Sequence, residues 1–341
     1  VDHARPLPRA RHHARPRADL RLPRRVACRG RGGRGMRRVV VTGASGLLGG
    51  YVARAVAEEA EVIGLDARAP AEPGEIAHVT ASILDEAALV AAFDGADAVL
   101  HIAAAANIGS GTGGHIIDLN VRGSWTVMEA ARRAGVRRVV LCSSDSVMGN
   151  TVWKEHFWCP EALPVNEAHP VRPADPYALS KYLAEEAGRS FAGRGLEVIA
   201  LRPVFILFPS MMGEIRARHA DPEGYAGPCA GGHAPAGGGL CWHHIDPRDV
   251  AEAFRLSLDL DWQGFEAFYL AAPSTLHPLP TLDRITQAFG RLPDRIDPAR
   301  YAANPFAPMF DTSAAARRLG WAARYDLRVE VIGTPTERTV P

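Results

Sequence analysis

A tyrosine and a lysine lie four residues apart in the segment Tyr177-Ala-Leu-Ser-Lys181. If this segment is helical, both side chains share one face, because residues four apart stand one turn above each other. A phenol normally loses its proton at about pH 10, and a neighbouring ammonium favours the phenolate and lowers the pKa. A tyrosine in that position can exchange a proton with a hydroxyl group while the adjoining carbon exchanges a hydride with a redox cofactor. The pair therefore predicts chemistry at a C–OH/C=O centre.

A glycine-rich segment follows a β-branched run that predicts a buried strand, and it opens an expected helix. The segment reads Gly43-Ala-Ser-Gly46-Leu47-Leu48-Gly49. Glycines let the backbone turn sharply and approach a pyrophosphate, and a helix N-terminus supplies N–H donors. A tight structural turn is the alternative, but the strand–loop–helix context is the one that a dinucleotide site requires.

Asp66 ends the next expected strand. A carboxylate there can accept hydrogen bonds from ribose hydroxyls and would repel a 2′-phosphate, so the cofactor is expected to be NAD and not NADP. Arg68 is the neighbouring residue that would favour NADP. Ser144 stands at the end of another expected strand, where it can orient a substrate hydroxyl and share its proton with Tyr177. For Ser144 alone, a serine-rich turn is the other interpretation.

Strands and helices alternate along the part of the chain that carries these motifs. We expect strands at 38–42, 61–66, 76–80, 98–102, 137–143 and 196–201, and helices at 46–60, 84–93, 115–134 and 176–192. This alternation predicts an α/β fold with a parallel sheet and right-handed crossovers. Beyond it, we expect helices at 247–260, 281–289 and 313–319 and a strand at 267–271. The stretch 209–241, rich in Gly, Pro, Ala and His, predicts a long irregular lid or binding loop.

The first 35 residues differ in composition from the rest. They hold 11 Arg and 2 Asp with no Ser, and they show no hydrophobic period. We expect a disordered extension, or a misassigned start with Met36 as the true first residue. The remaining chain is mildly acidic, so it predicts no nucleic-acid partner. No apolar run reaches the roughly 20 residues that a membrane span needs.

Five cysteines occur at irregular spacing. This number and spacing favour free thiols in a reduced, cytoplasmic setting. Cys241 stands close to two histidines, but the ligand spacing of a zinc site is missing, so no metal is expected.

Together these motifs resemble those of the extended short-chain dehydrogenase/reductases, the NAD-dependent epimerase/dehydratase family, over roughly residues 37–330. The likeness rests on Thr42 to Gly49, His101-Ile-Ala-Ala104, Asn120, Ser143-Ser144, Tyr177 to Lys181, Leu201-Arg-Pro203 and His244 to Ala251. The resemblance implies a Rossmann-like doubly wound parallel sheet with a smaller C-terminal substrate-binding lobe. Residues 36–205 would form the NAD-binding domain, 206–330 mainly the lobe with a returning strand and helix, and 331–341 a tail.

The resemblance also implies roles for single residues. Ser144, Tyr177 and Lys181 would be the catalytic set. The NAD site would comprise Gly43, Gly46, Leu47, Leu48, Gly49, Asp66, Ile83, Ala103, Asn120, Tyr177, Lys181 and Pro203. Asn120 would steady the central sheet and a proton-relay water. The helices at 115–134 and 176–192 would pair across a two-fold axis in a homodimer.

Departures from the family pattern leave the reaction open. Sugar-nucleotide epimerases carry an Arg where Leu240 stands here, although Arg216 or Arg218 could replace it. Dehydratases carry Asp-Glu where this chain has Asp145-Ser146. We expect epimerase-like hydride transfer between NAD and a secondary alcohol of a sugar or sugar derivative. A simple sugar or uronate dehydrogenase is the alternative, and a catalytically silent NAD-binding regulator is the alternative from another class.

Overall fold

The computed structural model describes residues 37–71, 74–151, 153–222, 224–225 and 239–332. The expected N-terminal extension, residues 333–341 of the expected tail, Cys28 and Cys229 lie outside these residues.

Seven parallel strands form one sheet in the order β3-β2-β1-β4-β5-β7-β8. The strands are β1 (Arg37–Thr42), β2 (Ala60–Asp66), β3 (Ala77–Thr80), β4 (Ala98–His101), β5 (Arg138–Cys142), β7 (Glu197–Pro203) and β8 (Phe265–Leu270). The order turns at β1, whose Thr42 is level with Leu65 of β2 and His101 of β4. The predicted Rossmann-like doubly wound sheet is thereby confirmed. In such sheets, ligands bind outside the carboxyl ends of the strands at this switch point.

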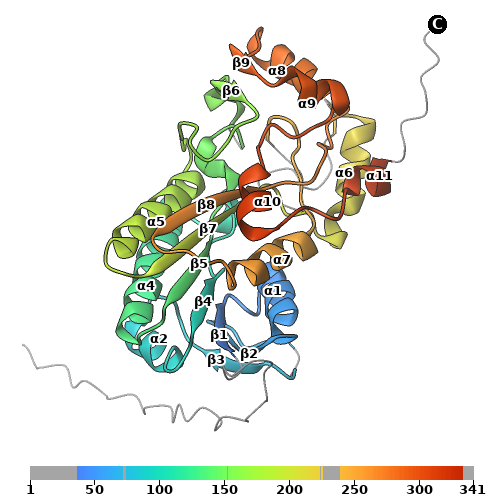
Figure 1. Cartoon of the computed structure of the whole chain (residues 1–341). Coiled ribbons are helices and arrows are strands. Elements are labelled where there is room, and N and C mark those ends of the chain that lie inside the picture. The colour runs from blue at the N-terminus through green and yellow to red at the C-terminus, as the bar shows by residue number, and fades with distance from the viewer. Residues whose placement is uncertain (1–36, 72–73, 152, 223, 226–238, 333–341) are drawn as a thin grey trace, which may run out of the picture. The chain divides into compact units, whose positions relative to one another are not determined.

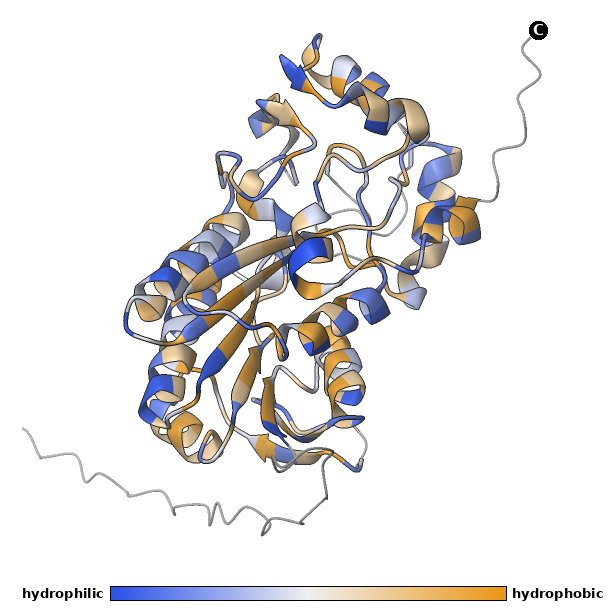
Figure 2. Ribbon diagram, viewed as in Figure 1, coloured by the Kyte–Doolittle hydropathy of each residue, from blue (hydrophilic) through white to orange (hydrophobic). Residues whose placement is uncertain are grey.

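The central strands are buried on both faces. Val39, Val40 and Val41 of β1 are fully buried, as are Val139 and Val140 of β5. Figure 2 shows hydrophobic residues running along these strands. A strand covered on both faces reads as a continuous β-branched run, which is why the sequence pattern was a reliable guide here.

Helices cover both faces of the sheet (Figure 1). On one face lie α1 (Leu47–Ala57) and α7 (Pro247–Ser257), and on the other lie α2 (Glu86–Ala92), α4 (Gly123–Arg133) and α5 (Pro176–Ala192). Aspartates cap three of them, because Asp85, Asp175 and Asp246 accept hydrogen bonds from backbone N–H groups of the first turn. Helix α5 also has Pro176 in its first turn, so its start is set locally.

The expected helix at 115–134 is interrupted. It consists of α3 (Gly113–Ile117), a π-helical turn (Asp118–Arg122) and α4. The π turn contains Asn120, whose Oδ1 accepts a hydrogen bond from the Ala105 N–H at 2.7 Å. Its Nδ2 donates to the Ala105 oxygen at 3.1 Å and to Ser180 Oγ at 2.9 Å. The turn accommodates a buried amide that a regular helix would have to orient differently.

The prediction that 209–241 is irregular throughout is wrong for one part of it. A 3₁₀ turn (Pro209–Met211) leads into α6 (Met212–Ala220). Residues 212–220 contain good helix formers, and the helix buries Ile215 in a small apolar cluster with Trp242 and Leu327. The Gly- and Pro-rich composition of the longer stretch concealed this helix. Residues 226–238 lie outside the described residues.

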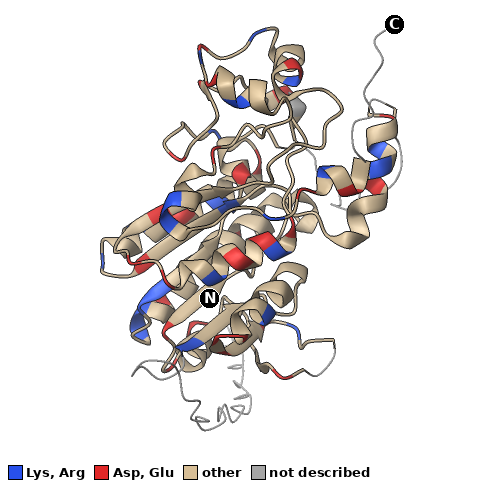
Figure 3. Ribbon diagram, turned by 45° about the vertical axis from the view of Figure 1, so that its right-hand side comes forward, with Lys and Arg blue, Asp and Glu red and all other residues tan. Residues whose placement is uncertain are grey.

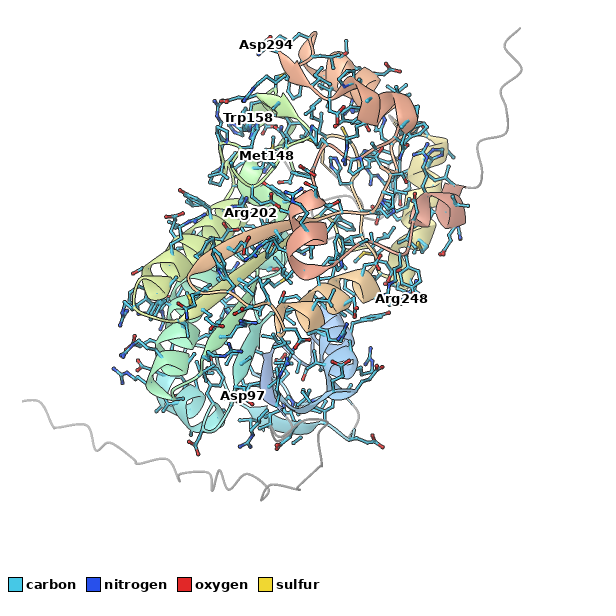
Figure 4. All side chains as sticks on the ribbon, viewed as in Figure 1. Asp97, Met148, Trp158, Arg202, Arg248 and Asp294 are labelled. Atoms are coloured by element: carbon cyan, nitrogen blue, oxygen red, sulfur yellow. The ribbon has the colours of Figure 1, made fainter. Side chains whose placement is uncertain are left out.

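The remaining elements are short. They are β6 (Ala162–Leu163), paired in parallel with β9 (Arg295–Ile296), and the helices α8 (Thr281–Phe289), α9 (Pro298–Ala303), α10 (Ser313–Leu319) and α11 (Leu327–Ile332). Further 3₁₀ turns occupy Ile108–Ser110, Asp145–Met148 and Lys154–His156. Trp158 links the segment after β5 to this region, since its Nε1 donates to the Met148 oxygen at 3.1 Å (Figure 4). The sequence did not predict β6, β9, α9 or α11, because two-residue strands and six-residue helices show too little of a period.

Candidate active site

A cavity of about 620 Å³ opens at the carboxyl ends of the central strands. Eleven of the twelve residues predicted for the NAD site line it, together with Ser144. These eleven are Gly43, Gly46, Leu47, Leu48, Gly49, Asp66, Ile83, Ala103, Tyr177, Lys181 and Pro203. The structure therefore brings the glycine-rich loop and the Tyr–Lys pair, far apart in sequence, into one cavity.

The glycine-rich loop leaves no room for side chains. Gly43 has φ +74°, and a Cβ there would lie 2.7 Å from the backbone nitrogen of Ala103. A Cβ at Gly49 would overlap the carbonyl oxygen of Gly43. Gly46 immediately precedes α1. This bare backbone at a helix N-terminus fits the pyrophosphate of a dinucleotide such as NAD.

Asp66 is held in place at the end of β2. Its Oδ2 accepts a hydrogen bond from Ser45 N–H at 3.2 Å, and its Oδ1 accepts one from Arg68 N–H at 3.0 Å. The Arg68 guanidinium lies 4.0 Å from Asp66 Oδ1, and its side chain is 78% exposed. An ion pair that exposed is weak, so the carboxylate keeps most of its negative field toward the cavity.

Tyr177 and Lys181 project from the first turns of α5 toward the end of β5. The Lys181 ammonium is buried and donates to the Cys142 carbonyl oxygen at 2.8 Å. It lies 5.7 Å from the centroid of the Tyr177 ring. Ser144 Oγ accepts a hydrogen bond from Ser146 N–H and donates one to Asp145 Oδ1, both at 3.1 Å. Ser144, Tyr177 and Lys181, which can each donate or accept a proton, therefore line the same cavity.

Burial dominates the electrostatics of this centre. It raises the pKa of Tyr177, with Cys142 adding to the rise and a hydrogen bond from Ser144 opposing it. Burial also lowers the pKa of Lys181. The expectation that Lys181 would lower the Tyr177 pKa therefore differs from the structure. Desolvation of the phenol outweighs the effect of an ammonium that is turned toward a carbonyl oxygen.

Asp145 is a further acid at the centre. It lines the cavity beside Ser144, and burial raises the pKa of Asp145 to about 7. Its carboxyl group is thus near the midpoint of its titration at neutral pH.

Helix α5 is anchored to the sheet by a buried ion pair. Arg202 on β7 and Glu185 on α5 are within 2.7 Å of each other, and both are at least 98% buried (Figure 4 labels Arg202). Ser143 Oγ donates to the same Glu185 carboxylate at 2.5 Å. Because these contacts lie one turn beyond Lys181, they hold the face of α5 that carries Tyr177 and Lys181 in register with the end of β5.

Asn120 is the one predicted NAD-site residue that does not line the cavity. Its amide binds the Ala105 backbone and Ser180, and Ser180 Oγ in turn donates to the Tyr177 carbonyl oxygen at 2.7 Å. The structure thus places Asn120 behind the cavity wall, where it connects the loop after β4 with α5.

His101 has a comparable place between β1 and α4. Its Nδ1 lies 2.8 Å from Thr42 Oγ1, and its Nε2 lies 3.0 Å from Ser124 Oγ. Burial, helped by Lys181, lowers the pKa of His101 to about 3, so the ring is neutral.

The sequence prediction omitted several residues that line the cavity. They follow strands β4 and β7 directly: Ala104, Ala106, Asn107, Ile108, Val204, Phe205, Ile206, Phe208 and Met211. Their position after the ends of strands could have identified them, since the carboxyl ends of parallel strands share one edge of the sheet. Of the two proposed substitutes for the epimerase arginine, Arg216 and Arg218, neither lines the cavity.

Among the described residues, no group of three or more His, Cys, Asp or Glu could hold a metal ion. Within the same residues, no helix is long and apolar enough to cross a membrane. Cys142, Cys159 and Cys241 are free thiols.

Residues 39–220 match the model of a known family, the NAD dependent epimerase/dehydratase family. The chain belongs to this family. The match includes the glycine-rich loop, Asp66, Ser144, Tyr177 and Lys181, which are the residues that meet in the cavity. A member of this family is an NAD-dependent enzyme, and NAD is the cofactor that the loop fits.

Two curated relatives each match about half of the chain. The L-arabinose 1-dehydrogenase (NAD(P)(+)) of Haloferax volcanii is 32% identical over 196 residues, which cover 56% of this chain and 74% of that protein. The uronate dehydrogenase of Pseudomonas putida is 30% identical over 170 residues, covering 48% of this chain and 59% of that protein. This chain thus spans somewhat more than half of the latter's length.

Solved structures match over more of the chain. The UDP-glucose-4-epimerase from Stenotrophomonas maltophila, determined with bound NAD and formylated UDP-arabinopyranose, is 26% identical with a TM-score of 0.61. The superposition covers 86% of this chain and 95% of that one. The structural likeness therefore extends beyond the residues of the parallel sheet.

Proposed function

We propose that this enzyme moves a hydride between NAD and a secondary alcohol of a sugar or sugar derivative in an epimerase-like reaction. One observation carries the proposal. Ser144, Tyr177 and Lys181 share a single cavity with the bare backbone of the glycine-rich loop and with Asp66. A cofactor held by the loop and a substrate held beside Ser144 would then meet in the same space.

In the proposed mechanism, NAD supplies the hydride acceptor and donor when bound, and its oxidised ring supplies a positive charge. Tyr177 Oη takes the proton of the substrate hydroxyl and returns it in the reverse direction. Ser144 Oγ orients that hydroxyl and shares its proton. Lys181, held by the Cys142 carbonyl oxygen, would bind the ribose hydroxyls and place its charge near the phenol.

The raised pKa of Tyr177 has a consequence for the direction of proton flow. A buried, neutral phenol is a ready proton donor, so the resting side chains favour protonation of a carbonyl oxygen. Oxidation of an alcohol requires the phenolate, and the positive charges of Lys181 and of oxidised nicotinamide favour that form. Oxidation is therefore expected to speed up with rising pH.

The remaining residues of the NAD site have supporting roles in this proposal. The loop from Gly43 to Gly49 would hold the pyrophosphate, and Asp66 the adenosine ribose. Ile83, Ala103 and Pro203 would contact the cofactor, since they line the cavity. Asn120, which lies behind the wall, would position α5 and not touch NAD.

A simple NAD-dependent sugar dehydrogenase is a second candidate. It is favoured by the relatives reported above, of which two are named as dehydrogenases of an aldose and of a uronate. The two candidates differ in whether reduced NAD leaves the protein after each turnover.

An anaerobic incubation with NAD and a panel of aldoses, uronates and UDP-sugars tests the proposal. Net absorbance of reduced nicotinamide identifies a dehydrogenase, and an epimeric product without net absorbance identifies an epimerase. Tyr177→Phe is expected to abolish either signal. Tight NAD binding without any product would instead favour the silent regulator.

We also propose a homodimer that pairs the helices α4 and α5. Trp125 on α4 and Leu179 on α5 are 45% and 40% exposed, although both are large and apolar. Closed two-fold pairing is the commonest way to cover such a face. Light scattering should report a dimer that Leu179→Arg dissociates, whereas a monomeric parent protein would contradict it. The free thiols fit the proposed cytoplasmic setting.

A further inference from the structure

The cavity has a second end, beyond Ser144 and Tyr177, which the segment after β7 walls. We call it the substrate end and define it by Thr151, Phe205, Ile206 and Met211. Three of these side chains are apolar, and Thr151 carries a neutral hydroxyl. Phe208 lines the side near the glycine-rich loop, since its ring lies 6.1 Å from that of Tyr51 on α1. A ligand there meets mainly hydrocarbon.

Cationic side chains are scarce along the described lining of the cavity. They are Arg68 and Lys181. Arg68 follows β2, which β1, β4 and β5 separate from β7 in the sheet. The ammonium of Lys181 is already engaged with the Cys142 carbonyl oxygen. Neither cation belongs to the substrate end.

The described lining beside Ser144 holds an acidic side chain and no cation other than Lys181. Asp145 is hydrogen-bonded to Ser144, and burial raises the pKa of Asp145 to about 7, so at neutral pH it is partly ionised. Helix α6 begins next to Met211 and buries Glu214 in its first turn. Asp145 therefore offers an anionic ligand no counter-charge.

The arginines of the surrounding lobe have other partners. Arg216 Nε donates to the Val331 oxygen at 3.3 Å, and Arg284 Nε donates to the Leu240 oxygen at 2.9 Å. The Arg218 guanidinium lies 4.2 Å from the centroid of the Trp242 ring. Figure 3 shows charged residues chiefly on the helices of the molecule. The sequence of residues 226–238 contains no Lys or Arg.

Transfer of a carboxylate or a pyrophosphate out of water is costly unless a cation or several N–H donors replace the lost hydration. Proteins that recognise phosphates and carboxylates usually present Arg or Lys for this purpose. From the apolar wall, the distance of Arg68 along the sheet and the engaged ammonium of Lys181, we infer that the substrate is an uncharged hydroxy compound, such as a neutral sugar or polyol. Uronates and nucleoside-diphosphate sugars are excluded from the substrate end. This inference rests on the proposed function.

The test uses D-galactose and D-galacturonate, which differ by a hydroxymethyl group against a carboxylate at one carbon. The full-length protein loaded with NAD should give a kcat/KM at least tenfold higher for galactose. Binding of the same two sugars and of UDP-galactose to the protein loaded with reduced NAD, followed by nicotinamide fluorescence, ranks them independently of turnover. Tighter binding or faster turnover of galacturonate or UDP-galactose would overturn the inference.

A charge-gain variant sharpens the test. Met211→Arg places a cation in the substrate end, and it should raise binding of galacturonate relative to galactose about tenfold. Gly213→Arg is the matched control, because Gly213 is exposed, has open space around its Cβ position and does not line the cavity. It should leave the ratio unchanged. An unchanged ratio in Met211→Arg would count against the inference.

Failure of the proposed function has a different signature. In that case neither sugar is oxidised, reduced or epimerised, although fluorescence still ranks the three ligands. The preference of the substrate end for an uncharged ligand would stand if galactose ranked first, and it would fall if a charged ligand did.

Discussion

The two ends of the cavity are built from different parts of the chain. At the end near β1 and β2, part of the wall is backbone: Gly43 and Gly49 leave no room for a Cβ, and N–H groups hold Asp66. At the substrate end, the wall is made of side chains such as Phe205 and Met211. A wall formed by backbone requires glycine at particular positions, so it can be recognised in the sequence. A side-chain wall accepts many residues, so it can differ between enzymes that share the cofactor.

The largest effect is expected where the two ends meet. Tyr177→Phe removes the proposed proton acceptor, so turnover should fall at least a hundredfold, within the usual contribution of a positioned acid–base group. NAD affinity should stay near that of the parent, because the loop from Gly43 to Gly49 is untouched. Stopped-flow turnover and calorimetric NAD titration measure the two quantities.

Tyr182→Phe serves as its control, since Tyr182 is on the same helix and does not line the cavity. If Tyr177→Phe turns over substrate at the rate of the parent protein, the proposed mechanism is contradicted and the silent regulator is favoured.

The glycine-rich loop should not accommodate one added methyl group without loss of NAD affinity. Gly49→Ala would push a Cβ into the Gly43 carbonyl oxygen, so the loop must shift. We expect NAD affinity to fall at least tenfold, or about 1.4 kcal/mol, together with a lower Tm. Gly50→Ala is the matched control, because its Cβ would come no closer than 3.4 Å, to the flexible Arg54 side chain. Equal NAD affinities of the two variants would show that the loop does not cradle the cofactor.

A smaller effect concerns the choice of cofactor. With Asp66 held by two N–H groups, NAD should bind at least tenfold more tightly than NADP, or about 1.4 kcal/mol. Asp66→Asn keeps the shape and removes the charge, so it should shrink this preference to a few-fold. Parallel titrations with both dinucleotides measure it. A preference of the parent protein for NADP would mean that Arg68 dominates the site.

The smallest expected effect is on the pH dependence of the free energy of unfolding. It concerns two buried histidines, one beside the sheet and one in the C-terminal part of the chain. Burial lowers the pKa of His101, beside β1, and of His243, in the lobe, to about 3. Because both folded pKa values lie below the unfolded value of about 6.5, the stability that the neutral rings provide is complete above that pH. It is lost as the pH falls toward 3.

Urea unfolding at pH values between 7 and 4 should therefore show a decreasing free energy. His243→Gln should flatten the curve, because one buried titrating ring is gone. If the variant and the parent have parallel curves, His243 does not contribute to acid unfolding.

Local sequence determined the elements that carry the chemistry. Asp175 and Pro176 set the start of α5, and the spacing of Tyr177 and Lys181 then placed both on one face. The β-branched run before Gly43 determined β1, and the glycines determined the turn that follows it. These are properties of a few adjacent residues, which is why they could be predicted without any knowledge of distant contacts.

Tertiary structure decided what surrounds those elements. Whether Phe205 and Met211 face the cavity depends on how the segment after β7 packs against residues far along the chain, among them Trp242 and Leu327. The buried position of Asn120 depends on Ala105 and Ser180, and the sign of the Tyr177 pKa shift depends on how completely the fold desolvates the phenol. Burial and the direction of a side chain arise from contacts between separate segments, so spacing along the chain cannot reveal them. The reactive groups are therefore a property of the local sequence, whereas the charge and shape that select their substrate arise from the packing of the lobe.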